Sequence, residues 1–257
     1  MDEKEHYVSQ KLKAELNKSE QPDRYSPPKY TIASAREVLR RAKYFSEDYL
    51  NKEFDIFWAL VSDRYLDAFY GQFTQLVGHG SWFTHGNSGV FGYSTGIDEM
   101  QMDNLSYNPT EAILVANELK LGGKKNKDQI LKYALMFRLL RDREFVAPNS
   151  RFLLLFIGDK KENLEWSSEI SKEIDYCQRS PKSTAKAVLH PEVVQVAESA
   201  EYAATTWRDL MRFNDSYVSS LNPQTQQVEQ KLLSGFNETL MAKKFMQNVR
   251  STPKSGH

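Results

Sequence analysis

The chain has 257 residues, of which 40% are hydrophobic and 26% charged, a composition typical of a globular protein large enough to bury a sizeable core. The 34 Lys and Arg residues balance 34 Asp and Glu, which excludes a global positive field that would draw the chain to nucleic acid. The single cysteine, Cys177, excludes an intramolecular disulfide and a cysteine-rich zinc site. No apolar run is long enough for a membrane span, and the charged N-terminus differs from a signal peptide, so we expect a soluble, cytoplasmic protein without a membrane partner.

Residues 1–45 are predicted to form an N-terminal helical extension with a linker. Apolar residues at helical spacing predict helices over 5–18 and 33–44, and the proline-rich segment 19–30 between them is typical of a linker. A long helix is predicted from Ser46 to about Gln72. Ser46 is a good N-cap, and an apolar stripe follows it along the helix.

From Gly78 the chain is rich in glycine and aromatic residues, which favours short strands and tight turns. Two strands are predicted at 99–107 and 112–121, on either side of an Asn-Pro-Thr turn signal. A helix over 126–144, a buried strand over 151–159 and a helix over 163–177 follow. This order predicts an α/β fold with a mixed sheet, with its core at 46–180.

Residues 181–257 are predicted to form a C-terminal helical region, with helices over about 191–219 and 224–248. The acidic segment 192–207 is compatible with packing on the core or with pairing two copies into a homodimer. Its pattern leaves both open.

The most apolar predicted strand, AILVANELKLGG, ends in a carboxylate and an ammonium. Glu118 and Lys120 project from the same face of a strand, because successive side chains alternate. An ionised group in such a strand is costly unless it is paired or binds a metal. The pattern is therefore compatible with a salt bridge at a solvated strand end or with a catalytic pair.

A second carboxylate precedes the turn. If the two strands are antiparallel, Asp103 would join Glu118 at one edge of the sheet, although a pairing symmetric about Asn108 would instead match Asp98 to Glu118. Two carboxylates with water suit Mg²⁺. Lys120 beside them would orient a water molecule or stabilise charge developing on a phosphate.

The following helix adds polar residues near its start. Gln129 and Tyr133 are spaced i and i+4 and hence share one face. Lys124, Lys125 and Lys127 precede them and would form a positive rim suited to phosphate contacts. The alternative is a solvated lysine turn beside a half-buried tyrosine.

Together, Asp103, the triplet Glu118-Leu119-Lys120 and the Gln129–Tyr133 pair resemble the PD-(D/E)XK nuclease superfamily, the last pair resembling the QxxxY motif of its RecB and lambda-exonuclease-like members. The resemblance covers about residues 46–177, where the predicted element order also matches that superfamily's restriction-endonuclease-like αβββαβ core. It implies a nuclease that uses Mg²⁺, or Mn²⁺ in its place, to hydrolyse phosphodiester bonds in DNA.

The resemblance also implies roles for individual residues. Asp103 and Glu118 would be metal ligands, and Lys120 would position the attacking water. Glu53 best matches an acidic residue that members often carry on the helix before the sheet. The proline expected before the first aspartate is absent, which leaves Asp98 as a rival to Asp103 as the first ligand. The neutral net charge favours an alternative function, a non-catalytic module on the same fold that binds nucleic acid or protein.

Overall fold

The computed structural model describes residues 47–86, 102–121, 125–160, 165–180 and 183–243. The chain divides between Lys43 and Tyr44 into two units, and every described residue belongs to the second. The helices and linker predicted before Ser46 lie outside the described residues, as do Asp98 and Lys124.

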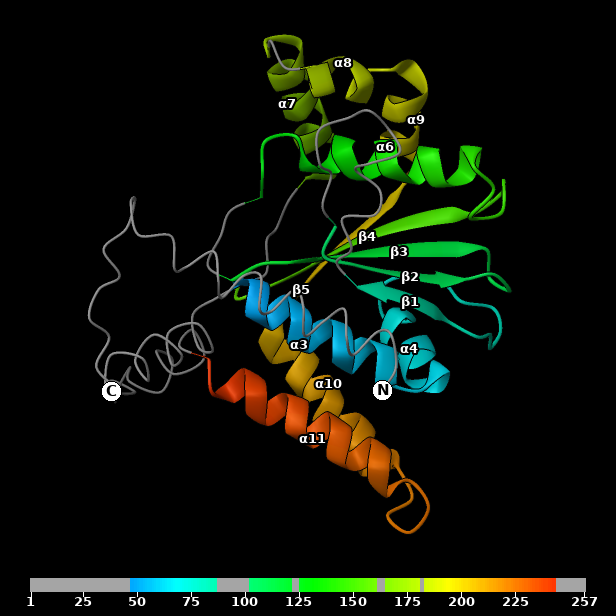
Figure 1. Ribbon diagram of the computed structural model, residues 1–257, viewed down its shortest axis with the longest axis vertical. Coiled ribbons are helices and arrows are strands. Elements are labelled where there is room, and N and C mark those ends of the chain that lie inside the picture. Colours follow the sequence, from blue (N-terminus) through cyan, green and yellow to red (C-terminus); the bar gives the residue numbers. More distant parts are fainter. Residues whose placement is uncertain (1–46, 87–101, 122–124, 161–164, 181–182, 244–257) are drawn as a thin grey trace, which may run out of the picture. The chain divides into compact units, whose positions relative to one another are not determined.

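The described part of the chain contains one sheet of five strands in the order β1-β2-β3-β4-β5 (Figure 1). The strands are β1 Phe83–Gly86, β2 Asn104–Asn108, β3 Ile113–Leu119, β4 Arg151–Gly158 and β5 Glu201–Thr206. The first three strands pair antiparallel, whereas β4 and β5 are parallel to β3. The predicted α/β class and mixed sheet are confirmed.

Helices cover both faces of the sheet (Figure 1). On one face lie α6 Gln129–Asp142, α7 Trp166–Gln178, α8 Ser183–Val188 and α9 Pro191–Ser199. On the other lie α3 Glu47–Leu60, α4 Asp63–Tyr70, α10 Trp207–Ser220 and α11 Gln227–Met241. No helix in the described part of the chain is long and apolar enough to cross a membrane.

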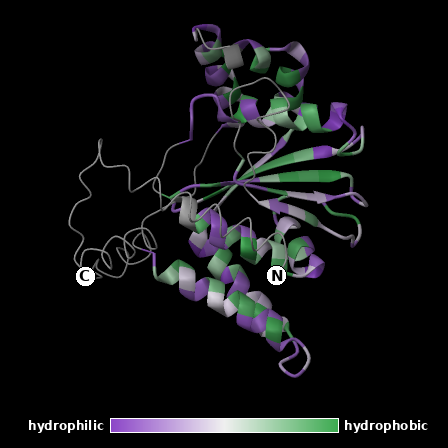
Figure 2. Ribbon diagram, in the orientation of Figure 1, coloured by the Kyte–Doolittle hydropathy of each residue, from purple (hydrophilic) through white to green (hydrophobic). Residues whose placement is uncertain are grey.

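Strand β3 lies between the two layers and is buried along its whole length. Its side chains alternate, so that Leu114 and Ala116 join the core under α6 while Ile113 and Val115 join the core under α3. A strand covered on both faces has no solvated side, which explains its nearly continuous apolar run. Figure 2 shows the apolar colour of β3 and β4 between helices of mixed colour.

The long helix predicted from Ser46 to Gln72 is wrong at its middle, because it breaks between Leu60 and Asp63. Ser62 has an extended backbone, and its hydroxyl oxygen accepts a hydrogen bond from the Tyr65 amide at 3.2 Å. Ser62 therefore caps a second helix, α4, which turns its own aromatic face into the core.

The continuous helix predicted over 191–219 is also wrong, because β5 interrupts it. The segment EYAATT contains tyrosine and threonine, which fit a strand, and it pairs parallel to β4 from Glu201 to Thr206. The Thr206 hydroxyl then accepts from the Asp209 amide at 3.0 Å and begins α10.

The residues after β5 complete the core that the earlier helices begin. Trp207 of α10 and Phe236 of α11 are buried against α3, where the Phe236 ring stacks on Phe57 with the ring centres 4.0 Å apart. The described part of the C-terminal region predicted as helical thus contributes β5 to the sheet, α8 and α9 to the face that α6 covers, and α10 and α11 to the face that α3 covers.

Candidate functional site

The ends of β2 and β3 bring Asp103 and Glu118 together. Asn104 pairs with Asn117, and Asp103 and Glu118 are the next residues beyond this pair on the two chain segments. The Leu119 amide donates to Asp103 Oδ2 at 2.8 Å, which holds the Asp103 carboxylate against the end of β3. The pairing symmetric about Asn108, which would have favoured Asp98, does not form, because Asn108 pairs with Ile113.

Glu118 is a buried carboxylate with partners from two elements. Its side chain is 3% exposed, and its Oε1 lies 2.6 Å from the ammonium of Lys120. Its Oε2 accepts a hydrogen bond from the Tyr133 hydroxyl of α6. The backbone of Lys120 is itself fixed, since its amide donates to Ile157 at 2.8 Å and its carbonyl accepts from the Trp207 indole at 2.9 Å.

The pKa of the Tyr133 phenol is affected by burial and by both carboxylates. Burial raises its pKa well above the ordinary value of tyrosine, and the negative charges of Glu118 and Asp103 raise this pKa further. The phenol therefore keeps its proton and acts as a hydrogen-bond donor.

Asn51 of α3 contacts the Asp103 carboxylate from the opposite layer. Its Nδ2 donates to Asp103 Oδ1 at 2.9 Å, and its side chain is 4% exposed. Asn51 was not among the predicted site residues. Its signal was present, because Asn51 precedes Phe54 by three positions and Trp58 by seven, and so lies on the buried face of the helix.

Beneath this site a buried polar network joins α3 and α4 to the sheet. The Tyr70 hydroxyl donates to Ser106 Oγ and accepts from the Trp58 indole, each at 2.8 Å. Asn117 donates to the same tyrosine oxygen at 2.8 Å and to the Asn104 side chain at 2.9 Å. These bonds join β2 just after Asp103 to β3 just before Glu118, and so hold the two strands together beside the site.

Gln129 and Glu53 have other partners in the structure. The Gln129 side chain is 8% exposed, and its oxygen accepts from the Asn126 amide at 2.9 Å, which closes the turn that begins α6. Glu53 Oε2 accepts from the ammonium of Lys243, a side chain that is 2% exposed, at 2.6 Å. Their expected roles at the carboxylates stay predictions.

The two described lysines of the predicted rim, Lys125 and Lys127, point in different directions. The Lys125 ammonium points inward, where it bonds to Glu173 Oε1 and lies 3.5 Å from Glu169 Oε2 of α7. Lys127 is exposed, with its ammonium 5.4 Å from the ring centre of Tyr176. Of the two lysines that the structure describes, Lys127 is the one that reaches solvent.

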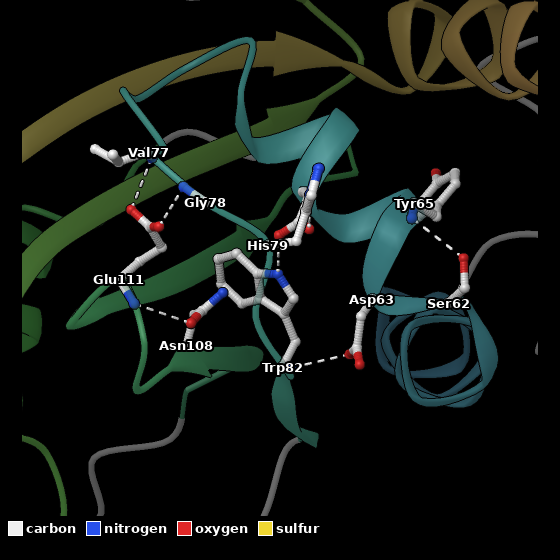
Figure 3. Close-up of polar contacts among 10 residues, drawn as sticks. Ser62, Asp63, Tyr65, Val77, Gly78, His79, Trp82, Asn108 and Glu111 are labelled. Carbon is white, nitrogen blue, oxygen red and sulfur yellow. Dashed lines mark hydrogen bonds and ion pairs between the residues drawn. The ribbon is translucent and has the colours of Figure 1, made fainter.

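A second polar cluster lies at the opposite end of β2 and β3 (Figure 3). Glu111, after the turn between these strands, accepts from the amides of Val77 and Gly78 at 2.9 and 2.6 Å. Buried Asp67 of α4 accepts from the Trp82 indole at 2.7 Å and lies 2.9 Å from the exposed ring of His79. These bonds hold the connection between α4 and β1 to the β2–β3 turn on one side and to α4 on the other.

Within the described residues, no group of three or more His, Cys, Asp or Glu side chains is arranged to hold a metal ion. The Asp103–Glu118 pair offers two carboxylates, and the amide of Asn51 lies beside them. Comparisons with protein-family models, curated proteins and solved structures found no match.

Proposed function

We propose that the protein is a Mg²⁺-dependent nuclease that hydrolyses phosphodiester bonds in DNA. The observation that carries this proposal is the meeting of Asp103, Glu118 and Lys120 at the end of β3, with Tyr133 bonded to the second carboxylate. The order α4, β1, β2, β3, α6, β4 also agrees with the αβββαβ core that the PD-(D/E)XK resemblance implies.

The donor set fits the ion. Mg²⁺ prefers oxygen ligands, is bound by few protein groups and keeps several water molecules, so Asp103 and Glu118 would suffice to hold it. A bound Mg²⁺ polarises the phosphate and helps generate the nucleophile. Mn²⁺ accepts the same oxygen ligands and would replace it.

The surrounding residues would do the remaining work. The Lys120 ammonium, 2.6 Å from Glu118, would orient the attacking water and offset negative charge that develops on the phosphate. Tyr133 would hold the Glu118 carboxylate in one orientation, because its phenol stays a donor. Exposed Lys127 would contact the phosphate backbone of the bound strand.

The decisive experiment is cleavage of linear, circular and single-stranded DNA, and of RNA, by the purified full chain with Mg²⁺ or Mn²⁺. We expect metal-dependent cleavage of DNA that falls at least about a hundredfold in Glu118→Gln and in Lys120→Met, the loss expected when one group stabilising the transition state is removed. The matched controls are Glu198→Gln and Lys231→Met, which change exposed residues of the same types. Cleavage that persists in both site variants would refute the assignment.

A second candidate is a non-catalytic binding module on the same fold. The observation that favours it is the saturation of the carboxylates, since Glu118 is bonded to Lys120 and Tyr133 while Asp103 is bonded to Asn51 and the Leu119 amide. This candidate predicts binding of DNA or protein without cleavage. It also predicts that Asp103→Asn does not change the heat measured on adding Mg²⁺. Calorimetry with the metal alone separates the two functions.

A further inference from the structure

Asn51 has a buried oxygen that the hydrogen bonds of the fold do not use. Its Nδ2 donates to Asp103, but its Oδ1 accepts from no group in the part of the chain that the structure describes. A buried amide oxygen without a partner costs about 1–3 kcal/mol. A residue needed only to fill the space between α3 and β2 would be apolar, as the adjacent buried Leu50 is.

The distance between this amide and Asp103 suits a shared cation. The terminal atom of Asn51 lies 2.9 Å from Asp103 Oδ1. Two neighbouring oxygens in an octahedral Mg²⁺ shell, each about 2.1 Å from the ion, are about 3 Å apart. A half-turn of the Asn51 amide exchanges its nitrogen and oxygen with almost no change of shape, and would place oxygen beside Asp103 Oδ1.

An amide is also the group that suits both states of the site. Without a cation its N–H stabilises the Asp103 carboxylate, as the structure shows. An aspartate at the same position would instead set a second negative charge beside Asp103, which is unfavourable in a buried place. The other oxygen of Asp103 is held by the Leu119 amide, so Oδ1 is the atom directed at Asn51.

We propose that Asn51 is a third ligand of the divalent cation, which it binds through its amide oxygen after the amide turns over. This inference rests on the proposed function, because it assumes a cation at Asp103 and Glu118. It adds a neutral oxygen from α3 to two carboxylates from the sheet. The cation would thereby fasten α3 to the ends of β2 and β3.

The test measures the binding of Mg²⁺ and Mn²⁺ alone by calorimetry, together with thermal unfolding in EDTA and in each ion. For Asn51→Leu we expect metal affinity to fall at least about tenfold, the lower end of losses seen when groups supporting a metal site are removed. For Asn51→Asp we expect tighter metal binding, a lower Tm in EDTA, and a larger rise of Tm on adding metal than in the unsubstituted protein. Asn222→Asp, which adds the same charge at an exposed asparagine, should match the unsubstituted protein.

The two substitutions of Asn51 separate a ligand from a residue that only orients Asp103. An aspartate cannot donate to Asp103, so a purely orienting role predicts weaker metal binding in Asn51→Asp as well as in Asn51→Leu, and that result would overturn the inference. Unchanged affinity in Asn51→Asp would overturn it too, and this arm stands even if Asn51→Leu does not fold. Failure of the unsubstituted protein to bind either ion would overturn the proposed metal chemistry and this inference together, whereas binding that only Asp103→Asn abolishes would overturn the role of Asn51 alone.

Discussion

The N-terminus of helix α6 is capped by a side chain of α7 and not by its own N-cap residue. Asp128, at its N-cap position, makes no side-chain cap bond. Instead Glu173 Oε1 accepts from the Ile130 amide at 3.1 Å and Oε2 accepts from the Leu131 amide at 2.9 Å. Glu173 is 1% exposed and also bonds the ammonium of Lys125, whose side chain is 9% exposed. We expect Glu173→Gln to be one of the most destabilising changes of this size in the protein.

The magnitude follows from the groups left behind. Gln keeps the volume of Glu but replaces one acceptor oxygen by an N–H₂ group, which leaves one helix amide or Lys125 facing a donor. Removing one partner of a buried ion pair costs about 3–5 kcal/mol, so we expect a loss of that order in the free energy of unfolding. Lys125→Met should cost only about 1–2 kcal/mol, because Glu173 keeps two amide donors at the positive end of α6.

The assay is urea unfolding of both single variants and of the double variant, followed by circular dichroism. The two losses should not add, and their coupling should be at least about 1 kcal/mol, because the residues share one interaction. Lys172→Met is the control, since Lys172 is 68% exposed and its ion pair with Glu169 should contribute no more than about 0.5 kcal/mol. Additive losses, or a Glu173→Gln loss no larger than that of the control, would refute the role given to Glu173.

Three further outcomes are expected. Burial raises the pKa of the Cys177 thiol to about 11, so native protein at pH 8 should react with a thiol reagent far more slowly than urea-unfolded protein, and equal rates would contradict the burial. Gly86→Ala would put a Cβ 2.4 Å from Asp55, which accepts from Asn104, and urea unfolding should show a loss of about 1–3 kcal/mol, whereas Gly235→Ala on α11 meets nothing within 4 Å and should cost nothing. If the protein binds DNA as proposed, Lys127→Ala should reduce the slope of log affinity against log salt by about 0.9, and an unchanged slope would place the DNA on another face.

The strands of the site were predictable because their signals are local. β3 and β4 read as apolar runs bounded by turn residues, and the Asn-Pro-Thr signal marks the turn that makes β2 and β3 antiparallel. Side-chain alternation then places Glu118 and Lys120 on one face, and in the structure Glu118 Oε1 lies 2.6 Å from Lys120 Nζ. Each of these inferences needs only residues within one strand or one hairpin.

The two broken helices show where local pattern fails. Residues 46–72 keep a helical apolar spacing through Ser62, yet the serine caps a new helix because α4 must turn its aromatic face towards α10. Residues 201–206 are compatible with a helix in isolation, but β4 would otherwise present an unpaired edge, and β5 covers it. In both places tertiary packing overrides the local preference.

Partners distant in sequence decided which polar residues belong to the site. Lys125 and Lys127 give the same signal two positions apart, yet Glu173, distant along the chain, takes Lys125 into the interior and leaves Lys127 in solvent. The helical spacing predicts that Asn51 is buried, but only the fold shows that its Nδ2 lies 2.9 Å from Asp103 Oδ1. A sequence pattern thus locates the buried ionised groups, each of which needs an ion-pair or hydrogen-bond partner. Only the fold determines which residue is the partner of each one. At this site the partner of Asp103 comes from α3, which lies in another layer and far along the chain. Asn51 is that partner, and among the described residues its Nδ2 is bonded whereas its Oδ1 is not.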